Sequence, residues 1–477
     1  MASADRGAES TKENDIEDVL CQLNILESKD GFKKKNEAVT KLEALLVSWV
    51  RDCAAEKNVK VVEDDRLLVQ LLPYGGHPLG VATRDGDVDT VCIVPQFVQR
   101  SDFFTKFVRR LERELDVAEL RVIEGAYVPL LKLTFYGTKI DVCLAILNMD
   151  MLPADFDVMD ESLNGLMDVA SVRAFNGVKQ MLALKSLVPD LKRFCVLLQV
   201  IKVWAKLNGI HSSQMGYPGG VTWAIMAARV CQLYPPESTA TQLVKYFFDM
   251  YAAWEWPNPV MLCLPSDDDP FGFEPWNPRR DTADGRQPMA VITPAYPEKN
   301  SVFAVTQSAL SVVVMCLVEA SRSVAEITSS KNPQWNRLFE PVEFFLRYKH
   351  FLKVSANART DQQLLDWSRL VSSRLRVFVA SLERRSSIKF IHLLAESFAS
   401  GTSVSWFIGI AFNSGQKIRL DIEKDVDEFI EHVRELGRKR NLYAAGMSVD
   451  VMHVREKDLS KHLATDQLHR LNVVEHK

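Results

Sequence analysis

The sequence has few cysteines and no two of them at a CxxC spacing: eight of its 477 residues are cysteine. Several lie inside apolar runs, as Cys195 does in RFCVLLQVIKVW. This usage excludes a disulfide framework or a zinc site built on paired cysteines, and it is typical of a reducing compartment. We therefore expect an intracellular protein with free thiols.

Other familiar signals are missing as well. The first residues, MASADRGAESTKEND, contain no apolar signal core, and no uninterrupted apolar run is long enough to span a membrane. A Walker-type phosphate loop and a cysteine-based nucleophile are also absent. We therefore expect a soluble protein without a membrane partner, whose chemistry does not depend on cysteine.

Neither sign of charge is in large excess, because the net charge of the whole chain is −4. The distribution is uneven, since residues 331–477 carry 24 Lys and Arg against 18 Asp and Glu, and the preceding residues have the acidic excess. A positive C-terminal third is compatible with a module that contacts phosphates, although an ordinary solvated surface explains an excess of this size equally well.

The apolar pattern divides the chain into segments of different periodicity. Residues 15–53 have apolar positions at helical spacing and predict two helices. Residues 54–170 indicate an α/β unit, in which DFFTKFVRRLERELD predicts an amphipathic helix and AYVPLLKLTFYGTKIDVCLAIL a β-hairpin with its turn at 136–138. Residues 171–340 are mainly helical, with an irregular stretch rich in proline, glycine and tryptophan at 257–297.

Residues 341–460 predict a second mixed unit. Its predicted elements are a strand at 347–356, a helix at 362–383, strands at 388–395 and 403–412, a helix at 425–440 and a strand at 447–454. The order βαββαβ is the ferredoxin-like arrangement shared by RNA-recognition modules. The aromatic signature for base stacking on the sheet is absent. Residues 1–14 are expected to be a disordered N-terminus, and 461–477 a C-terminal tail.

The stretch RDGDVDTVCIVP places two carboxylates at the start of an apolar strand. Because side chains two residues apart on a strand share a face, Asp87 and Asp89 should project side by side. Like charges this close raise each other's pKa unless a cation lies between them. A divalent metal ion would supply that cation, whereas an isolated pair of this kind is more often two solvated loop residues.

Asp141, in GTKIDVCLAIL, adds a third carboxylate near the start of another predicted strand. Neighbouring strands lie about 5 Å apart, so acids on both can converge on one site. Three carboxylates suffice for two Mg²⁺ or Mn²⁺ ions, one at an attacking hydroxyl and one at the phosphates of the leaving group. Asp87, Asp89 and Asp141 are therefore the candidate catalytic and metal-binding residues.

A glycine-containing loop precedes the aspartate pair. In YGGHPLG, Gly75 and Gly76 lack Cβ atoms and would let the backbone approach a phosphate closely. The order of glycine pair, short turn, DxD strand and later lone aspartate resembles that of the polymerase-β-like nucleotidyltransferases. That resemblance implies a nucleotidyltransferase α/β domain. With the helical segment and the βαββαβ segment predicted above, we expect an α+β fold with a nucleotidyltransferase α/β domain, a helical central domain and a C-terminal ferredoxin-like or RRM-like domain.

Further motifs narrow the resemblance to the eukaryotic nuclear poly(A) polymerases, in the same order and with similar spacing. These motifs are FNGVK (175–179), VIKVWAKLNGI (200–210), GYPGGVTWAIMAARVCQLYP (216–235), WNP (276–278), VITPAYP (291–297) and FFLRYKHFLKV (344–354). The last of them stands where that family begins its RNA-binding domain. Other poly(A) and uridylyl transferases share the aspartates but usually lack this C-terminal domain.

The resemblance implies a role for each matching residue. The three aspartates would hold two metal ions. Gly75 and Gly76 match a glycine–serine pair whose hydroxyl contacts the triphosphate, so that here only backbone N–H groups remain. Lys202 and Lys206, one helical turn apart, match lysines of the nucleotide site, with Lys202 on the triphosphate and Lys206 in support.

Three polar residues also match nucleotide contacts of the family. His211 stands in place of a tyrosine and could donate a hydrogen bond to phosphate, more strongly when protonated; the alternative is a tolerated surface histidine. Asn176 would contact the nucleotide. Thr293 would approach the adenine.

Four further positions match apolar or backbone contacts. Val128 and Val221 would pack against bases. Gly219 and Gly220 would let the backbone approach the nucleotide. Ordinary packing is the alternative explanation at each of these four positions.

The resemblance implies template-independent addition of AMP from ATP to RNA 3′ ends, with release of pyrophosphate. Two alternatives stay open: a terminal nucleotidyltransferase of another base preference, such as a uridylyltransferase, and a non-catalytic RNA-binding scaffold on the same fold. The family further implies a nuclear location, a monomer, and 3′-end processing factors as partners besides RNA and ATP.

Overall fold

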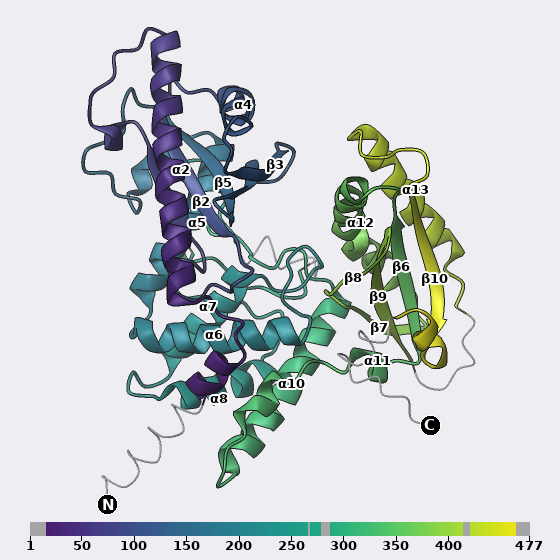
Figure 1. Ribbon diagram of the computed structural model, residues 1–477. Helices are drawn as coiled ribbons and strands as arrows, with labels where there is room; N and C mark the ends of the chain where they lie inside the picture. Colours follow the sequence, from purple (N-terminus) through teal and green to yellow (C-terminus); the bar gives the residue numbers. More distant parts are fainter. Residues whose placement is uncertain (1–15, 266–267, 278–286, 414–419, 464–477) are drawn as a thin grey trace, which may run out of the picture.

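The computed structural model describes residues 16–265, 268–277, 287–413 and 420–463. The predicted disordered residues 1–14 and most of the predicted tail lie outside the described residues. Two lobes that each contain a sheet are joined by a helical centre, from which α10 (Gln307–Ser329) leads to the C-terminal lobe (Figure 1).

The N-terminal lobe is built on a five-stranded sheet. Its elements are α2 (Lys29–Glu56), η1 (Asp65–Leu67), β1 (Gln70–Tyr74), β2 (Val88–Pro95), α3 (Arg100–Asp102), η2 (Phe103–Phe107), α4 (Val108–Leu111), β3 (Val117–Ile123), β4 (Leu130–Phe135) and β5 (Thr138–Leu147). The strand order is β1-β2-β5-β4-β3, with β2 parallel to β5 and the other neighbours antiparallel. Because β2 and β5 are buried on both faces, their sequences are almost continuously apolar.

Local sequence explains how this sheet is assembled. The predicted hairpin forms from β4 and β5 around a two-residue turn, in which Tyr136 has φ +47° and Gly137 φ +70°. The helix predicted from DFFTKFVRRLERELD is shorter than expected and ends at Leu111. Phe103 and Phe107 anchor its first turns in the core, whereas Leu115, beyond its end, is fully exposed.

The helical centre packs beneath this sheet. Its elements are η3 (Glu161–Leu166), α5 (Val169–Leu187), α6 (Leu191–Leu207), α7 (Gly220–Leu233), α8 (Ala240–Ala252), α10 and η4 (Trp335–Phe339). The Asp168, Asp190 and Thr239 side chains accept hydrogen bonds from backbone N–H groups at the N-termini of α5, α6 and α8. Trp204 and Trp223, buried on α6 and α7, meet edge to face and fix the contact between these helices.

By length and composition alone, α10 is apolar enough to cross a membrane, which differs from the expectation that no segment would be. The expectation considered only uninterrupted apolar runs, and charged residues such as Glu319 and Arg322 interrupt this one. The helix is nevertheless apolar enough on average, because these charges are isolated. Half of the segment is buried in the protein, where α10 packs against α8 and against strand β7 (Ile388–Leu393). A core helix has the same pattern.

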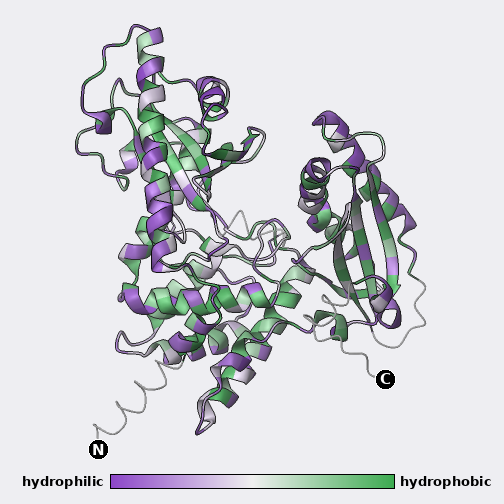
Figure 2. Ribbon diagram, in the orientation of Figure 1, coloured by the Kyte–Doolittle hydropathy of each residue, from purple (hydrophilic) through white to green (hydrophobic). Residues whose placement is uncertain are grey.

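The C-terminal lobe has the predicted βαββαβ order. Its elements are α11 (Phe344–Arg347), β6 (His350–Asn357), α12 (Asp361–Leu382), β7, β8 (Phe398–Ser400), β9 (Ser403–Phe412), α13 (Glu423–Lys439), β10 (Ser448–Arg455) and η5 (Glu456–Lys461). The strands run antiparallel in the order β10-β6-β9-β7, with the short β8 added to β9. The strands of both sheets are largely hydrophobic, whereas α2 and α13 also carry hydrophilic stretches (Figure 2).

Candidate functional site

A cavity of about 710 Å³ lies between the edge of the first sheet and the helices of the centre. Its walls include eleven of the residues singled out from the sequence: Gly75, Gly76, Asp87, Asp89, Asn176, Lys202, Lys206, His211, Gly220, Val221 and Thr293. The other three candidates, Val128, Asp141 and Gly219, are not among its lining residues. Residues that are far apart in sequence therefore meet at one hollow.

The register of two parallel strands aligns two of the aspartates. Asp89 on β2 pairs with Asp141 on β5, and the Thr90 hydroxyl donates a hydrogen bond of 2.9 Å to the Asp141 carbonyl. Asp87 immediately precedes β2 and is exposed, whereas Asp141 is buried. The structure thus brings the three predicted carboxylates together near the N-terminal ends of the neighbouring strands β2 and β5.

A lysine that the sequence analysis did not single out lies between these acids. Lys132 on β4 is the strand partner of Asp141. Its ammonium donates to Asp141 Oδ2 and lies 3.6 Å from Asp87 Oδ2. About one third of the Lys132 side chain is exposed, so the ammonium contacts both carboxylates at the border with solvent.

Burial and mutual repulsion perturb the acids. Desolvation, followed by the charges of Asp87 and Asp141, raises the pKa of Asp89 to about 7. Burial also raises the pKa of Asp141, although the hydrogen bond and charge of Lys132 oppose that rise. The carboxylates therefore have more negative charge than their surroundings neutralise, which favours a bound cation.

The donor set fits a hard divalent cation by its chemistry, since Mg²⁺ and Mn²⁺ prefer carboxylate oxygens. Within residues 16–265, 268–277, 287–413 and 420–463, however, no group of three or more Asp, Glu, His or Cys side chains is already arranged to hold a metal ion. Lys132 offers a reason, because its ammonium contacts oxygens of Asp141 and Asp87 that a metal ion would need.

The glycine pair makes close approaches on both of its sides. Gly75 has φ +74°, and a Cβ atom there would lie 3.1 Å from Asp89 Oδ2. A Cβ atom on Gly76 would lie 2.9 Å from Lys202 Nζ. Glycine at 75 is thus favoured by backbone conformation, and glycine at 76 gives the Lys202 ammonium room beside the loop.

The two predicted lysines of α6 have different surroundings. Lys202 Nζ donates a hydrogen bond of 2.8 Å to the Val81 carbonyl, and burial lowers the pKa of Lys202 to about 8. Lys206 is partly exposed and pairs with both oxygens of Asp85, at 3.0 and 2.8 Å. Lys202 therefore presents a poorly solvated positive charge to the cavity, whereas the charge of Lys206 is already balanced.

His211 is a half-buried side chain on the cavity wall. Its Nδ1 atom is inaccessible to solvent and has no hydrogen-bond partner in the described part of the chain. Burial, together with the positive charges of Lys202 and Lys206, lowers the pKa of His211 to about 4. The imidazole is therefore neutral near pH 7, so the stronger donation expected from a protonated ring does not operate there.

Two other polar candidates contact backbone groups around the cavity. Asn176 Nδ2 lies 3.5 Å from the Pro297 carbonyl, and its Oδ1 accepts a hydrogen bond of 2.9 Å from Gln180. Thr293 Oγ1 accepts a hydrogen bond of 2.9 Å from the Lys299 N–H. Both side chains link the cavity wall to the segment around residues 293–299.

Of the remaining apolar and glycine candidates, some line the cavity and others do not. Val221 is 40% exposed and lines the cavity beside Gly220, where an added Cβ atom would meet nothing within 4 Å. Gly219 is the N-cap residue of α7. Val128 packs against the core next to β4 and is not in the cavity wall. The structure brings Val221 and Gly220 to the site, but not Val128.

Lys132 and Asp85 are the site residues that sequence reasoning missed. The position of Lys132 could have been predicted from the sequence, because a two-residue turn at 136–137 places residue 132 opposite residue 141. Asp85 stands next to the DxD motif in RDGDVDT, but its pairing with Lys206 joins residues 121 positions apart. That contact requires knowledge of how α6 packs.

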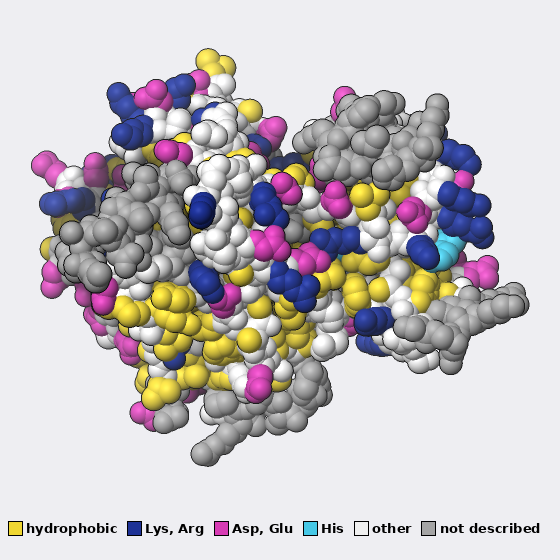
Figure 3. Space-filling view, turned by 90° about the horizontal axis from the view of Figure 1, so that it is seen from below, with side chains coloured by type: hydrophobic (Ala, Val, Ile, Leu, Met, Phe, Trp, Pro, Cys, Tyr) yellow, Lys and Arg dark blue, Asp and Glu magenta, His cyan; other side chains and the backbone are white. Residues whose placement is uncertain are grey.

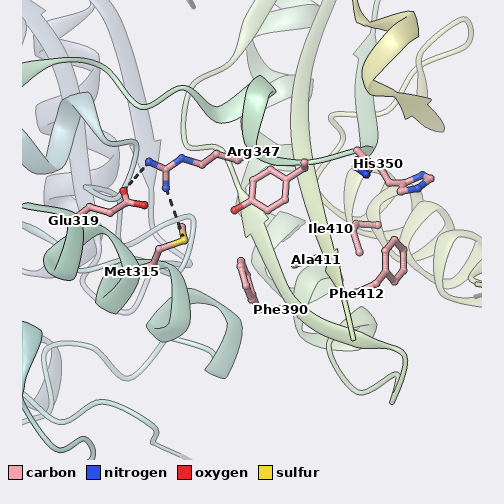
Figure 4. Close-up of a pocket in the computed structure, with 10 residues that line it drawn as sticks. Met315, Glu319, Arg347, His350, Phe390, Ile410, Ala411 and Phe412 are labelled. Atoms are coloured by element: carbon pink, nitrogen blue, oxygen red, sulfur yellow. Dashed lines mark hydrogen bonds and ion pairs between the residues drawn. The ribbon is translucent and has the colours of Figure 1, made fainter. Parts of the chain in front are cut away.

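A second hollow, of about 630 Å³, lies between α10 and the C-terminal sheet (Figure 4). Arg347 spans its border, donating a hydrogen bond of 2.7 Å to Glu319 and lying 3.8 Å from Met315 Sδ. Phe390 and Phe412 form its aromatic wall. It includes none of the predicted site residues, and its ion pair connects the C-terminal lobe to the helical centre.

Three family descriptions match consecutive parts of the chain. They are the poly(A) polymerase nucleotidyltransferase domain at 4–188, the poly(A) polymerase central domain at 193–341, and the poly(A) polymerase predicted RNA binding domain at 343–405 and 400–472. The fold is thus that of a polymerase-β-like nucleotidyltransferase, as expected. The chain belongs to the poly(A) polymerase family, which confirms the resemblance identified in the sequence.

Curated relatives agree over nearly all of this chain. Nuclear poly(A) polymerase 2 of Arabidopsis thaliana is 32% identical, over 96% of this chain and 58% of the relative. Nuclear poly(A) polymerase 4 of the same plant is 32% identical, over 93% of this chain and 60% of the relative. Poly(A) polymerase of Dictyostelium discoideum is 29% identical, over 93% of this chain and 56% of the relative. This chain therefore spans less than two thirds of the length of these relatives. A solved structure of Cid1 in complex with its short product ApU aligns with 69% of this chain and 98% of that one, at 16% identity and a TM-score of 0.49.

Proposed function

We propose that the protein is a template-independent poly(A) polymerase that adds AMP from ATP to RNA 3′ ends and releases pyrophosphate. The observation that carries the proposal is the alignment of Asp89 with Asp141 at the edge of a cavity that Lys202 also lines, in a chain of the poly(A) polymerase family. Divalent ions held by the three aspartates would supply charge neutralisation at the reacting phosphate and activation of the RNA 3′-hydroxyl.

The protein's own groups then position the triphosphate. Lys202 would neutralise a phosphate oxygen from a half-buried, poorly solvated position, where the attraction between an ammonium and a phosphate is stronger than in water. The N–H groups of Gly75 and Gly76 would contact phosphate directly, because no side chain covers them. His211 would donate from a neutral ring, and Lys206 could assist after release from Asp85.

Nucleotide recognition would come from the helical side of the cavity. In this proposal Asn176 contacts the nucleotide, Val221 packs against a base, and Gly220 permits close approach. Thr293, held by Lys299 N–H, would approach the adenine. The ligands thus come from the sheet and from the helices alike, so closure of the two around ATP would complete the site.

The C-terminal lobe is proposed to hold the RNA. Lys and Arg side chains gather on this lobe, beside an exposed histidine, in the view of Figure 3. We assign the catalytic domain to 54–170, the nucleotide-contacting domain to 171–340 and the RNA-binding domain to 341–460. The helices at 15–53 do not all pack with the centre: Ile16 and Leu20 share its core, whereas α2 packs on the first sheet and is grouped with the catalytic domain. A nuclear location is part of the proposal because two of the relatives are named nuclear. A monomeric state and association with 3′-end processing factors are proposed from the family resemblance alone.

The test is extension of labelled oligo(A) by the purified chain with each of the four NTPs, in Mg²⁺ and then in Mn²⁺. ATP should be incorporated, and Asp89→Ala should lower the rate at least about a hundredfold. Asp155→Ala, at an exposed position, is the matched control and should retain activity. Preferred incorporation of UTP would make the protein a uridylyltransferase, and no extension under any condition would favour a non-catalytic RNA-binding scaffold.

A further inference from the structure

We propose that Lys132 is an internal counter-ion of the metal site, whose ammonium occupies carboxylate oxygens that divalent ions need and must withdraw when those ions bind. The inference rests on the proposed function, because it takes Asp87, Asp89 and Asp141 as the metal ligands. It adds a residue that competes with the metal, and it predicts that removing this residue tightens metal binding.

The position of Lys132 follows from strand pairing. The turn at Tyr136–Gly137 fixes the register of β4 against β5, so Lys132 and Asp141 are directly opposed. Paired residues on neighbouring strands project on the same face of a sheet. The ammonium consequently contacts Asp141 Oδ2 and lies 3.6 Å from Asp87 Oδ2.

The neighbouring lysines are engaged elsewhere. Lys202 donates to the Val81 carbonyl, and Lys206 pairs with Asp85. Among the described residues, Lys132 is the only cation that forms an ion pair with any of the three aspartates, and it pairs with two of them, Asp87 and Asp141. Without it, three carboxylates would face one another with no positive charge in contact with them.

Withdrawal of Lys132 is physically feasible. The side chain is 34% exposed, compared with 13% for Asp141, and a lysine has a flexible four-carbon stem. Rotation about these bonds can carry the ammonium into solvent without moving either strand. The ion pair must be broken for a metal ion to take the same oxygens, so its strength is subtracted from the metal affinity.

The experiment measures Mn²⁺ binding directly, by the electron paramagnetic resonance signal of free Mn²⁺, without nucleotide or RNA and at constant ionic strength. Lys132→Met removes the charge but keeps a chain of similar length. Lys132→Arg retains a cation. Lys139→Met removes a charge from an exposed position two residues before Asp141 on β5, so it controls for the general loss of positive charge.

Lys132→Met should bind Mn²⁺ about three- to tenfold more tightly than the unmodified protein, the range expected when a partly exposed competing ion pair is lost. Lys132→Arg should bind as the unmodified protein does, and Lys139→Met should differ by less than about twofold. In EDTA, Lys132→Met should also melt at a lower temperature, and Mn²⁺ should raise its Tm more than that of the unmodified protein.

Two results would overturn the role of Lys132 alone: Mn²⁺ affinity that is unchanged or weaker in Lys132→Met, or a gain in Lys139→Met as large as that in Lys132→Met. A failure of every variant and of the unmodified protein to bind Mn²⁺ would overturn the two-ion site itself, and the counter-ion with it. If Lys132→Met does not fold, Lys132→Gln takes its place with the same expected direction.

Discussion

Replacement of Asp89 with asparagine should stabilise the metal-free protein while it removes activity. Asp89 has a folded-state pKa of about 7, raised from 3.8 by burial and by the charges of Asp87 and Asp141. A pKa that is higher in the folded than in the unfolded state means that the ionised side chain destabilises the fold. The penalty is absent well below pH 3.8, grows between the two pKa values, and is complete above pH 7.

The size of the effect follows from that shift. About three pKa units correspond to about 4 kcal/mol at 1.36 kcal/mol per unit, and partial exposure of the site reduces this to about 2–4 kcal/mol. At pH 5 the linkage relation leaves less than half of the gain found at pH 8. For a folding unit of the size of the N-terminal lobe, the gain at pH 8 corresponds to a rise in Tm of roughly 5–10 °C.

The assay is differential scanning calorimetry in EDTA at pH 5 and pH 8. Asp89→Asn should melt well above the unmodified protein at pH 8, with a smaller difference at pH 5. Asp155→Asn, at an exposed position, should change Tm little at either pH. A difference that is equal at both pH values, or a lower Tm for Asp89→Asn at pH 8, would refute the argument that this carboxylate is held at an energetic cost.

Three further predictions address the remaining charged groups. Burial lowers the pKa of Lys202 to about 8, so ATP affinity measured by fluorescence titration should fall as pH rises through 8, and Lys202→Met should bind roughly 10- to 100-fold more weakly without that dependence. The low pKa of His211, about 4, predicts that His211→Ala raises the KM for ATP by a similar factor at pH 6 and pH 8; activity indifferent to this substitution across that range would contradict its phosphate contact. Arg347→Ala should lower Tm by a few degrees through loss of about 1 kcal/mol at the Glu319 ion pair, and limited proteolysis should then cut more readily between α10 and β6 than in the unmodified protein.

Strand and turn chemistry made much of the first lobe predictable. The hairpin of β4 and β5 was expected at 136–138, and its two-residue turn also fixes which residues oppose each other. The same reasoning predicted βαββαβ order at the C-terminus. The pairing of Asp89 with Asp141 was a weaker expectation, because β2 and β5 are parallel and about 50 residues apart, so that only the packing of the intervening elements sets their register.

Ion pairs between residues far apart in the chain could not be predicted from the sequence. The pattern of α6 placed Lys202 and Lys206 on one helical face, and both line the cavity, but the pattern could not distinguish their environments. Lys206 is neutralised by Asp85, whereas Lys202 is half-buried with its ammonium next to Gly76. The difference arises because the loop before β2 packs across α6, a contact between segments more than 100 residues apart.

The pKa shifts of three groups in the cavity all favour the neutral form, and this common direction argues for a charged ligand. Burial raises the pKa of Asp89 and lowers the pKa values of Lys202 and His211, so each group is driven toward its neutral form. Groups that were merely structural would be expected to have partners that offset this cost. A metal–triphosphate complex has cations for the aspartates and anionic oxygens for Lys202, and it would offset both costs at once. Binding either the metal or the triphosphate alone should therefore be weaker than binding the two together, and metal titrations with and without a non-hydrolysable ATP analogue will measure that coupling.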